Sequence, residues 1–166
     1  MVSSAAIFHH DFQPLLADYD PGVLENDQGT IYGLWPDLTL AYFNPARFRF
    51  AAENGGEPAI SQDWRLGRQV LEAIALPLRP FFEQNYRRCL LEDRPWEHFY
   101  ECSSDQLYRQ FHMTAFPLGR SKGLLVVNSL RVESEHHREV SPPVGKLYMT
   151  EHNLSCSVVI AAGFGG

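Results

Sequence analysis

The pattern of hydrophobic and polar positions along the chain predicts two strands, a helical middle and three further strands. Residues 31–35 and 38–43 form two strand-like apolar runs, and Pro36-Asp37 between them suits a tight turn. Asn44 then offers an N-cap, and Pro45 suits the first helical position, where its missing N–H costs nothing. Helices are expected over about 45–53, 61–75 and 80–92, and the later strands over 95–102, 107–116 and 123–132.

Strands and helices are segregated in this order, and the two flanks differ from the middle in composition. The order predicts an α+β fold in which one antiparallel sheet carries its helices on one face. Residues 1–27 hold a weak apolar pattern and are expected to form an N-terminal arm or short helix, and residues 28–133 the domain itself. Residues 134–166 begin as a polar, proline-broken stretch, so a partly irregular C-terminal extension is expected there.

Composition excludes several classes of protein. A hydrophobic content of 45% and an aromatic content of 13% are enough for a packed core, so the chain as a whole is not disordered. With 14 basic and 20 acidic residues the net charge is -6, which is unsuited to binding the phosphates of a nucleic acid. No apolar run reaches the roughly 18 to 20 residues of a membrane span, so no membrane partner is expected.

Cysteine usage and the N-terminal sequence bear on the compartment. The chain has three cysteines without a CxxC spacing, which does not form a disulfide framework and favours a reducing environment. The first twelve residues lack the basic start and the apolar core of a signal peptide. A cytoplasmic location is therefore expected.

The stretch 94–116 concentrates the residue types that build metal sites, namely His98, Glu101, Cys102 and His112. If its two strands pair around a four-residue loop at 103–106, the opposite pairs are Trp96–Met113, His98–Phe111, Tyr100–Arg109 and Cys102–Leu107. In that register His98 and His112 point to opposite faces and cannot ligate one metal. A register one residue different would bring the two histidines together, but Cys102 would then lie roughly 13 Å from His98 along the strand. No metal site and no catalytic residues are predicted.

The face that this register turns toward the core carries the candidate ligand-binding residues. Phe111 and Met113 are expected to be core, while His98, Tyr100 and Arg109 need polar partners if they are buried. Asn128, the lone amide in an apolar strand, raises the same question. A bound ligand is one such partner; main-chain carbonyls, water or a neighbouring carboxylate are others. The predicted ligand-binding set is therefore His98, Tyr100, Arg109, Phe111, Met113 and Asn128.

Over about residues 28–133 the chain resembles a PAS domain, the sensory fold of signalling proteins. The resemblance rests on the strand ending in "LAYFNPARF", on "DRPWEH" at 93–98, and on "YRQFHMTAFPL" followed by "GLLVVNSLRVE". It implies a five-stranded antiparallel sheet with a pocket between the sheet and its helices. Such domains bind small molecules or cofactors and pass a signal on, often as homodimers. No kinase, helix-turn-helix or cyclase sequence follows the domain here, so either the chain works alone or the output is expected from a separate partner protein.

The resemblance leaves the cofactor unknown. Flavin-binding members carry a cysteine in an Asn-Cys-Arg-Phe-Leu-Gln type of motif, and the comparable "WRLGRQVLEAI" has no cysteine, which argues against covalent flavin. Haem-binding members ligate iron through a helical histidine, and residues 61–92 contain none. His98, on a strand, is the remaining candidate for a haem ligand.

Three hypotheses for the function follow. The first is a sensory module that binds a small, partly apolar molecule between the sheet and the helices of 45–92 and shifts a population of conformers. The second is a ligand-free interaction or dimerisation module whose pocket is filled by side chains, with an apolar patch such as "SVVIAAGFGG" as its interface. The third is a small isomerase-like enzyme; the hairpin ahead of the helices and the absence of catalytic motifs argue against it.

Overall fold

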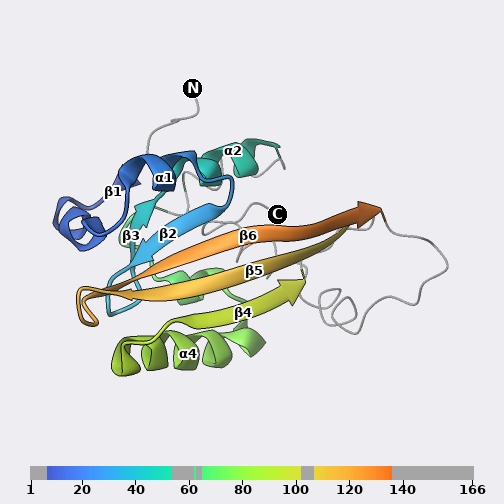
Figure 1. The fold of residues 1–166 in the computed structure, drawn as a ribbon. Helices are drawn as coiled ribbons and strands as arrows, with labels where there is room; N and C mark the ends of the chain where they lie inside the picture. The colour runs from blue at the N-terminus through green and yellow to red at the C-terminus, as the bar shows by residue number, and fades with distance from the viewer. Residues whose placement is uncertain (1–6, 54–61, 63–64, 102–106, 136–166) are drawn as a thin grey trace.

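The computed structural model describes residues 7–53, 62, 65–101 and 107–135, which are built around one six-stranded antiparallel sheet (Figure 1). In spatial order the strands are β1 (Ile7–Phe8), β3 (Leu40–Phe43), β2 (Thr30–Leu34), β6 (Gly123–Glu135), β5 (Leu107–Leu118) and β4 (Trp96–Glu101). The predicted α+β class, with five antiparallel strands and helices, is confirmed, and β1 adds a short sixth strand at one edge.

One face of the sheet, called the inner face below, is covered by α4 (Arg79–Glu92) and by the short 3₁₀ helices η2 (Val70–Ala73) and η3 (Leu76–Leu78). Pro80 lies in the first turn of α4, and the helix ends where Asp93 takes a left-handed conformation with φ of 52°. Between these points α4 buries one stripe against the sheet, made of Phe82, Tyr86, Cys89 and Leu90. Helical spacing places those four side chains on one side of the helix.

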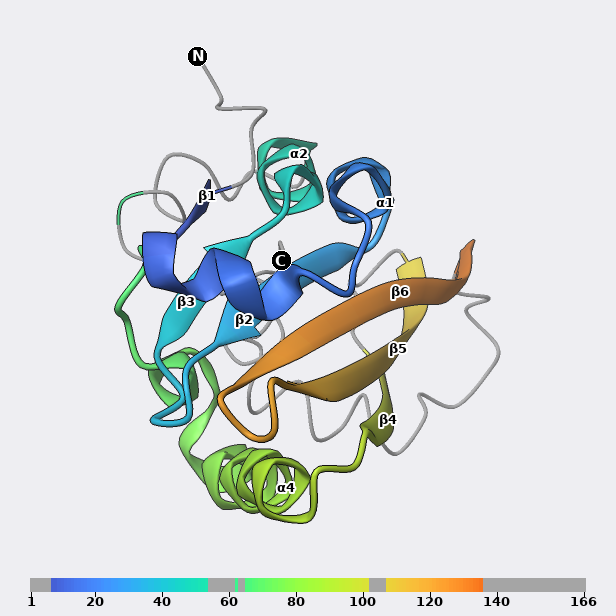
Figure 2. The ribbon, with the colours of Figure 1, turned by 60° about the vertical axis from the view of Figure 1, so that its left-hand side comes forward.

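The opposite, outer face is covered by the N-terminal segment, which contains the 3₁₀ helix η1 (His10–Leu16) and the helix α1 (Pro21–Asn26). In Figure 2 this blue segment crosses in front of β3 and β2, while α4 lies at the bottom of the view. Phe12 of η1 is fully buried, and its ring packs edge to face on the ring of Trp35, with the two ring centres 5.0 Å apart. Gly33 makes this possible, because a Cβ there would lie 2.4 Å from the Phe12 ring.

Asn44 joins the outer-face segment to the sheet, just before α2 (Pro45–Glu53). Its Oδ1 accepts the N–H of Ile31 at 2.9 Å, and its Nδ2 donates to the carbonyls of Gly29 at 2.9 Å and Leu24 at 3.3 Å. The side chain is fully buried, and its bonds to Ile31 and Leu24 satisfy backbone groups in the interior, while the bond to Gly29 is partly buried. The Asn-Pro step in the sequence is therefore a structural junction as well as the start of a helix, and α2 lies beside α1 (Figure 2).

The predicted helix over 61–75 is wrong in its second half, where only η2 is helical; residues 61, 63 and 64 lie outside the described residues. Gly67 has φ of 89°, which a continuous right-handed helix does not allow. The segment instead bonds to the β3 edge: the N–H of Gly67 donates to the Leu40 carbonyl at 2.7 Å, and the N–H of Leu40 donates to the Arg68 carbonyl at 2.8 Å. The apolar side chains of this segment, among them Val70 and Ile74, pack into the core of the inner face.

Candidate ligand site on the inner face of β4, β5 and β6

The pairing of β4 with β5 corrects the predicted register by two residues. Trp96 lies opposite Ala115, His98 opposite Met113 and Tyr100 opposite Phe111. The predicted partners were two positions earlier on β5. The connection is longer than the four-residue loop assumed: β4 ends at Glu101, which pairs with Gln110. Because side chains alternate with a period of two, a shift of two residues leaves every side chain on its predicted face.

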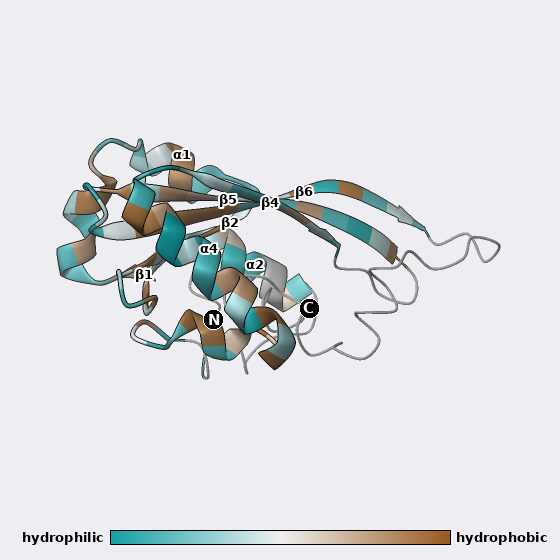
Figure 3. Ribbon diagram, turned by 90° about the horizontal axis from the view of Figure 1, so that it is seen from below, coloured by the Kyte–Doolittle hydropathy of each residue, from teal (hydrophilic) through white to brown (hydrophobic). Residues whose placement is uncertain are grey.

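Five of the six predicted ligand-binding residues come together on this face, in two successive rows across the strands. One row contains His98, Met113 and Asn128, and the next contains Tyr100, Phe111 and Leu130. Met113 and Asn128 are buried and Phe111 is nearly so, whereas His98 and Tyr100 are half-buried and Leu130 is exposed. The inner face therefore changes from closed core to accessible surface as it runs from α4 toward the far ends of β5 and β6, which project beyond the helices (Figures 1 and 3).

A stack of three rings on β4 forms the wall of this region. Trp96 and His98 stack with their centroids 5.6 Å apart, and His98 and Tyr100 stack at 6.2 Å, both with 18° between planes. Phe81 and Phe82 of α4 approach the same imidazole at 5.0 and 5.8 Å. Such a surface suits a flat or branched apolar group, since aromatic side chains supply large contact area with little loss of side-chain entropy.

The imidazole of His98 lies in the middle of the wall, and its nitrogens make no hydrogen bond to any residue that the structure describes. Burial lowers the pKa of His98 below the ordinary 6.5, because the aromatic surroundings disfavour the charged form. At neutral pH the ring is therefore neutral, with one nitrogen that donates and one that accepts.

Hydroxyl groups lie beneath the wall in two hydrogen-bonded groups. The Tyr32 and Tyr86 hydroxyls are 2.7 Å apart, and the Tyr86 hydroxyl also donates to the sulfur of Met113 at 3.8 Å. The Tyr100 hydroxyl donates to Oδ1 of Asn128 at 3.2 Å, whose amide donates to the Thr30 carbonyl at 3.4 Å. Burial raises the pKa of all three phenols, so they stay protonated.

Sequence reasoning missed Tyr32 and Tyr86 as members of this region. Tyr32 lies within the predicted strand over 31–35 and Tyr86 within the predicted helix over 80–92, and neither was singled out as polar. Their hydroxyls meet across 54 positions of sequence, and no local pattern signals a pair at that separation. A polar tip on an otherwise apolar stripe was the available clue, because a buried tyrosine hydroxyl needs a partner.

Arg109, the sixth predicted residue, lies apart from the others. Its guanidinium is paired with Glu133 at 2.7 Å, where β5 and β6 run together beyond β4. His112 is on the outer face, stacked on Phe99 at 4.5 Å and 3.5 Å from a Glu97 oxygen. His98 and His112 thus point to opposite sides, and no group of three or more metal-ligating side chains lies within the described ranges.

The lowered pKa of His98 predicts a pH dependence of stability. As pH falls below 6.5, the unfolded chain takes up the proton before the folded one, so the free energy of unfolding falls. His98→Phe keeps an aromatic ring and should remove this part of the loss. Urea unfolding at about pH 7.5 and about pH 5.5 measures it. His10→Gln, at a side chain 97% exposed, is the control and should keep the full loss; an equal loss in His98→Phe would contradict the assignment.

Comparison with known proteins adds little to this description. No family model matches the chain, and no curated protein matches it. Among solved structures, the PAS domain of an HTR-like protein from Haloarcula marismortui is similar at 21% identity with a TM-score of 0.37, over 66% of this chain and 87% of that one. No helix in the described part of the chain is long and apolar enough to span a membrane.

Proposed function

We propose that the protein is a sensory module of the PAS-like kind, which binds a small, partly apolar molecule on the inner face of β4, β5 and β6. The observation that carries this proposal is the half-buried imidazole of His98. It is walled by the rings of Trp96, Tyr100, Phe81 and Phe82, and its nitrogens are without hydrogen bonds among the described residues. A polar group in apolar surroundings gains most from a ligand that completes its hydrogen bonds.

The surroundings define the chemistry of the ligand. A flat apolar body would lie along the stacked rings of β4, and one polar atom would meet the neutral imidazole. A strongly charged ligand is disfavoured, because the described side chains that line this part of the inner face are neutral at pH 7 and the phenols are held protonated.

The signal in this proposal is a shift between conformers. A ligand that touches both β4 and α4 favours the arrangement in which the two elements are closest, by the difference in its affinity for the two arrangements. A partner protein or a second copy would read the change from the outer face of β4, where Phe99 is 55% exposed. The chain is then a binding protein rather than an enzyme, acting as a homodimer or with a separate signalling protein.

A ligand-free interaction module is the alternative that one specific observation favours. On the outer face of the sheet, Phe99 of β4 and Val132 of β6 are 55% and 41% exposed, so two apolar side chains are available to a partner there. In this version the inner face is simply core, and the outer face binds the partner.

Tyr100→Ala separates the sensory module from the interaction module, because it removes one ring of the inner wall. Phe99→Ala is the matched variant, since Phe99 is the preceding residue on β4 and its side chain lies on the outer face. We expect native mass spectrometry of protein purified from its own cells to show a non-covalent small-molecule mass on the wild type and on Phe99→Ala. In Tyr100→Ala the fraction of protein that carries this ligand should fall at least about fivefold, because the loss of one ring contact weakens binding by roughly 1 kcal/mol. Equal loss in both variants, or loss only in Phe99→Ala, would contradict the inner-face site.

A further inference from the structure

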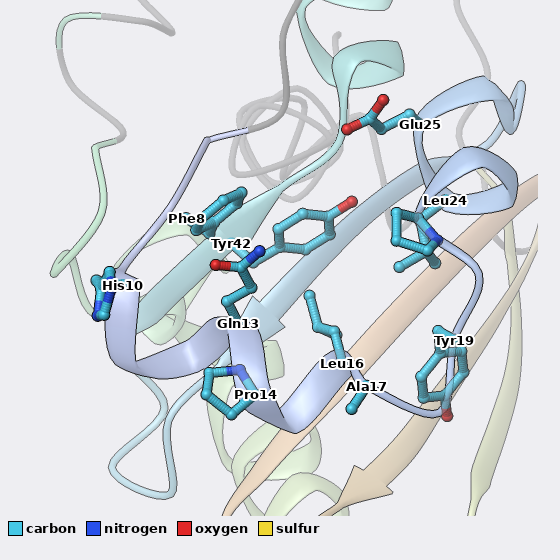
Figure 4. A pocket seen from close by; sticks show the side chains of 11 residues that line it. Phe8, His10, Gln13, Pro14, Leu16, Ala17, Tyr19, Leu24, Glu25 and Tyr42 are labelled. Carbon is cyan, nitrogen blue, oxygen red and sulfur yellow. The ribbon is translucent and has the colours of Figure 1, made fainter.

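A pocket of about 530 Å³ opens on the outer side of the molecule, far from the inner-face site. It lies between η1, α1 and the edge formed by β1 and β3 (Figure 4). Its walls are mostly apolar and include Phe8, Pro14, Leu16 and Leu24, and Tyr42 forms its floor. This size matches the range of about 300–1,000 Å³ that is usual for small-molecule sites. Neither the sequence prediction nor the proposed function uses this pocket.

Tyr42 is the polar group that marks the pocket as a binding site. Its side chain is 2% exposed, and its hydroxyl makes no hydrogen bond to any of the residues the structure describes. Figure 4 shows that hydroxyl pointing toward the side of the pocket where Leu24 and Glu25 lie, away from Gln13. Burial, and then the nearby Glu25 carboxylate, raises the pKa of Tyr42, so the hydroxyl remains protonated. The hydroxyl lines the pocket and can both donate and accept, so a polar ligand atom at this point would form a hydrogen bond with it.

The charge around the pocket selects the kind of ligand. Between Phe8 and Gly29 the chain carries five acidic residues, Asp11, Asp18, Asp20, Glu25 and Asp27, and no lysine or arginine. Glu25 itself lines the pocket and forms no ion pair with the described residues. Two arginines of α2 lie near this segment: Arg49 donates to the Asp27 carbonyl at 3.4 Å, and the Arg47 guanidinium lies 3.7 Å from the centre of the Phe43 ring. An anion would therefore be repelled here and a cation attracted.

We propose that this pocket binds a small organic cation: an amine whose apolar or aromatic body lies on Phe8, Leu16 and Leu24. The ammonium group donates hydrogen bonds to the Tyr42 hydroxyl and to the Glu25 carboxylate. The rings of Phe8 and Tyr42 add the attraction of an aromatic face for a cation. The site is separate from the inner-face site, so each can fail without the other.

The test uses phenethylamine as the probe and the whole ¹⁵N-labelled chain as the protein. We expect amide resonances within residues 8–25 to shift, with a dissociation constant on the order of 1 mM, as suits a fragment of this size. Two matched analogues keep the phenyl body: 3-phenylpropionate, which is anionic, should shift these resonances at least about tenfold less at equal concentration, and 2-phenylethanol should lie between.

Two variants assign the polar contacts. Tyr42→Phe removes only a hydroxyl that bonds to no described residue, so the fold is preserved, and binding should weaken by about three- to tenfold. Glu25→Gln should weaken it by a similar factor, while Glu92→Gln at the end of α4 should leave it unchanged. Absence of shifts at about 10 mM probe, equal shifts with the anion, or unaltered binding in both Tyr42→Phe and Glu25→Gln would overturn the proposal. Tyr100→Ala should not change the phenethylamine shifts, which keeps this result independent of the inner-face site.

Discussion

Replacing Asn44 with alanine is expected to lower the free energy of unfolding by about 3–5 kcal/mol. The fully buried side chain holds the Ile31 N–H and the carbonyls of Gly29 and Leu24. Alanine would leave all three backbone groups without a partner, and each unsatisfied buried group costs about 1–3 kcal/mol. Equilibrium unfolding in urea, followed by circular dichroism, measures the loss.

Asn26→Ala is the matched control for this measurement. Asn26 is exposed at the end of α1, where its amide donates to the Gly22 carbonyl at 2.7 Å, and its loss should cost under about 0.5 kcal/mol. A loss in Asn44→Ala no larger than that of the control would mean that the Asn-Pro step only starts α2. The junction between the outer-face segment and the sheet would then lie elsewhere.

Phe12→Ala should lower the free energy of unfolding by about 3–5 kcal/mol, since the ring is fully buried between η1 and the sheet. The neighbouring Gln13→Ala, at an exposed position, should have little effect. A small loss in Phe12→Ala would show that the N-terminal segment is an arm that the domain does not need.

A double substitution makes the same test sharper. Gly33→Ala alone should be strongly destabilising, because its Cβ would lie 2.4 Å from the Phe12 ring. In the Phe12→Ala background that collision is gone, so the added cost of Gly33→Ala should fall by at least about 1 kcal/mol. Strictly additive losses would contradict the packing described for this face.

The sequence predicted the faces of the strands better than their partners. Alternation fixed which side of the sheet His98, Tyr100, Phe111 and Met113 share, and a register error of two residues left that assignment intact. The partners depend on the length of the connection between β4 and β5, which the residue types at 103–106 do not determine. The same register error placed Arg109 opposite Tyr100 in the predicted site. In the structure Phe111 lies opposite Tyr100, and Arg109 is paired with Glu133.

The outer face was beyond what the local pattern could predict. Phe8, Phe12 and Leu16 show apolar spacing, but nothing in that spacing says which surface they cover. Their place is decided by long-range features, such as the missing side chain at Gly33 and the hydrogen bonds of Asn44. The pocket floored by Tyr42 arises from the same packing, so it could not be predicted either.

The two binding surfaces differ in the ligands that they suit. The inner face offers stacked rings and a neutral imidazole, whereas the outer pocket offers apolar walls with a tyrosine hydroxyl and a carboxylate. The protein would then bind a flat, neutral ligand on the inner face of the sheet and an organic cation in the pocket on the outer face. Their occupancy can be coupled only through the sheet, because no residue lines both.

The central claim is that the inner face of β4, β5 and β6 holds a small molecule. The most direct measurement is native mass spectrometry of the wild-type chain purified from its own cells, with an absorption spectrum of the same sample. We predict a mass above that of the polypeptide that is lost on denaturation; a visible band would identify a haem or flavin chromophore. A bare polypeptide mass under both conditions, with the protein running as an empty dimer, would contradict the claim and favour the interaction module.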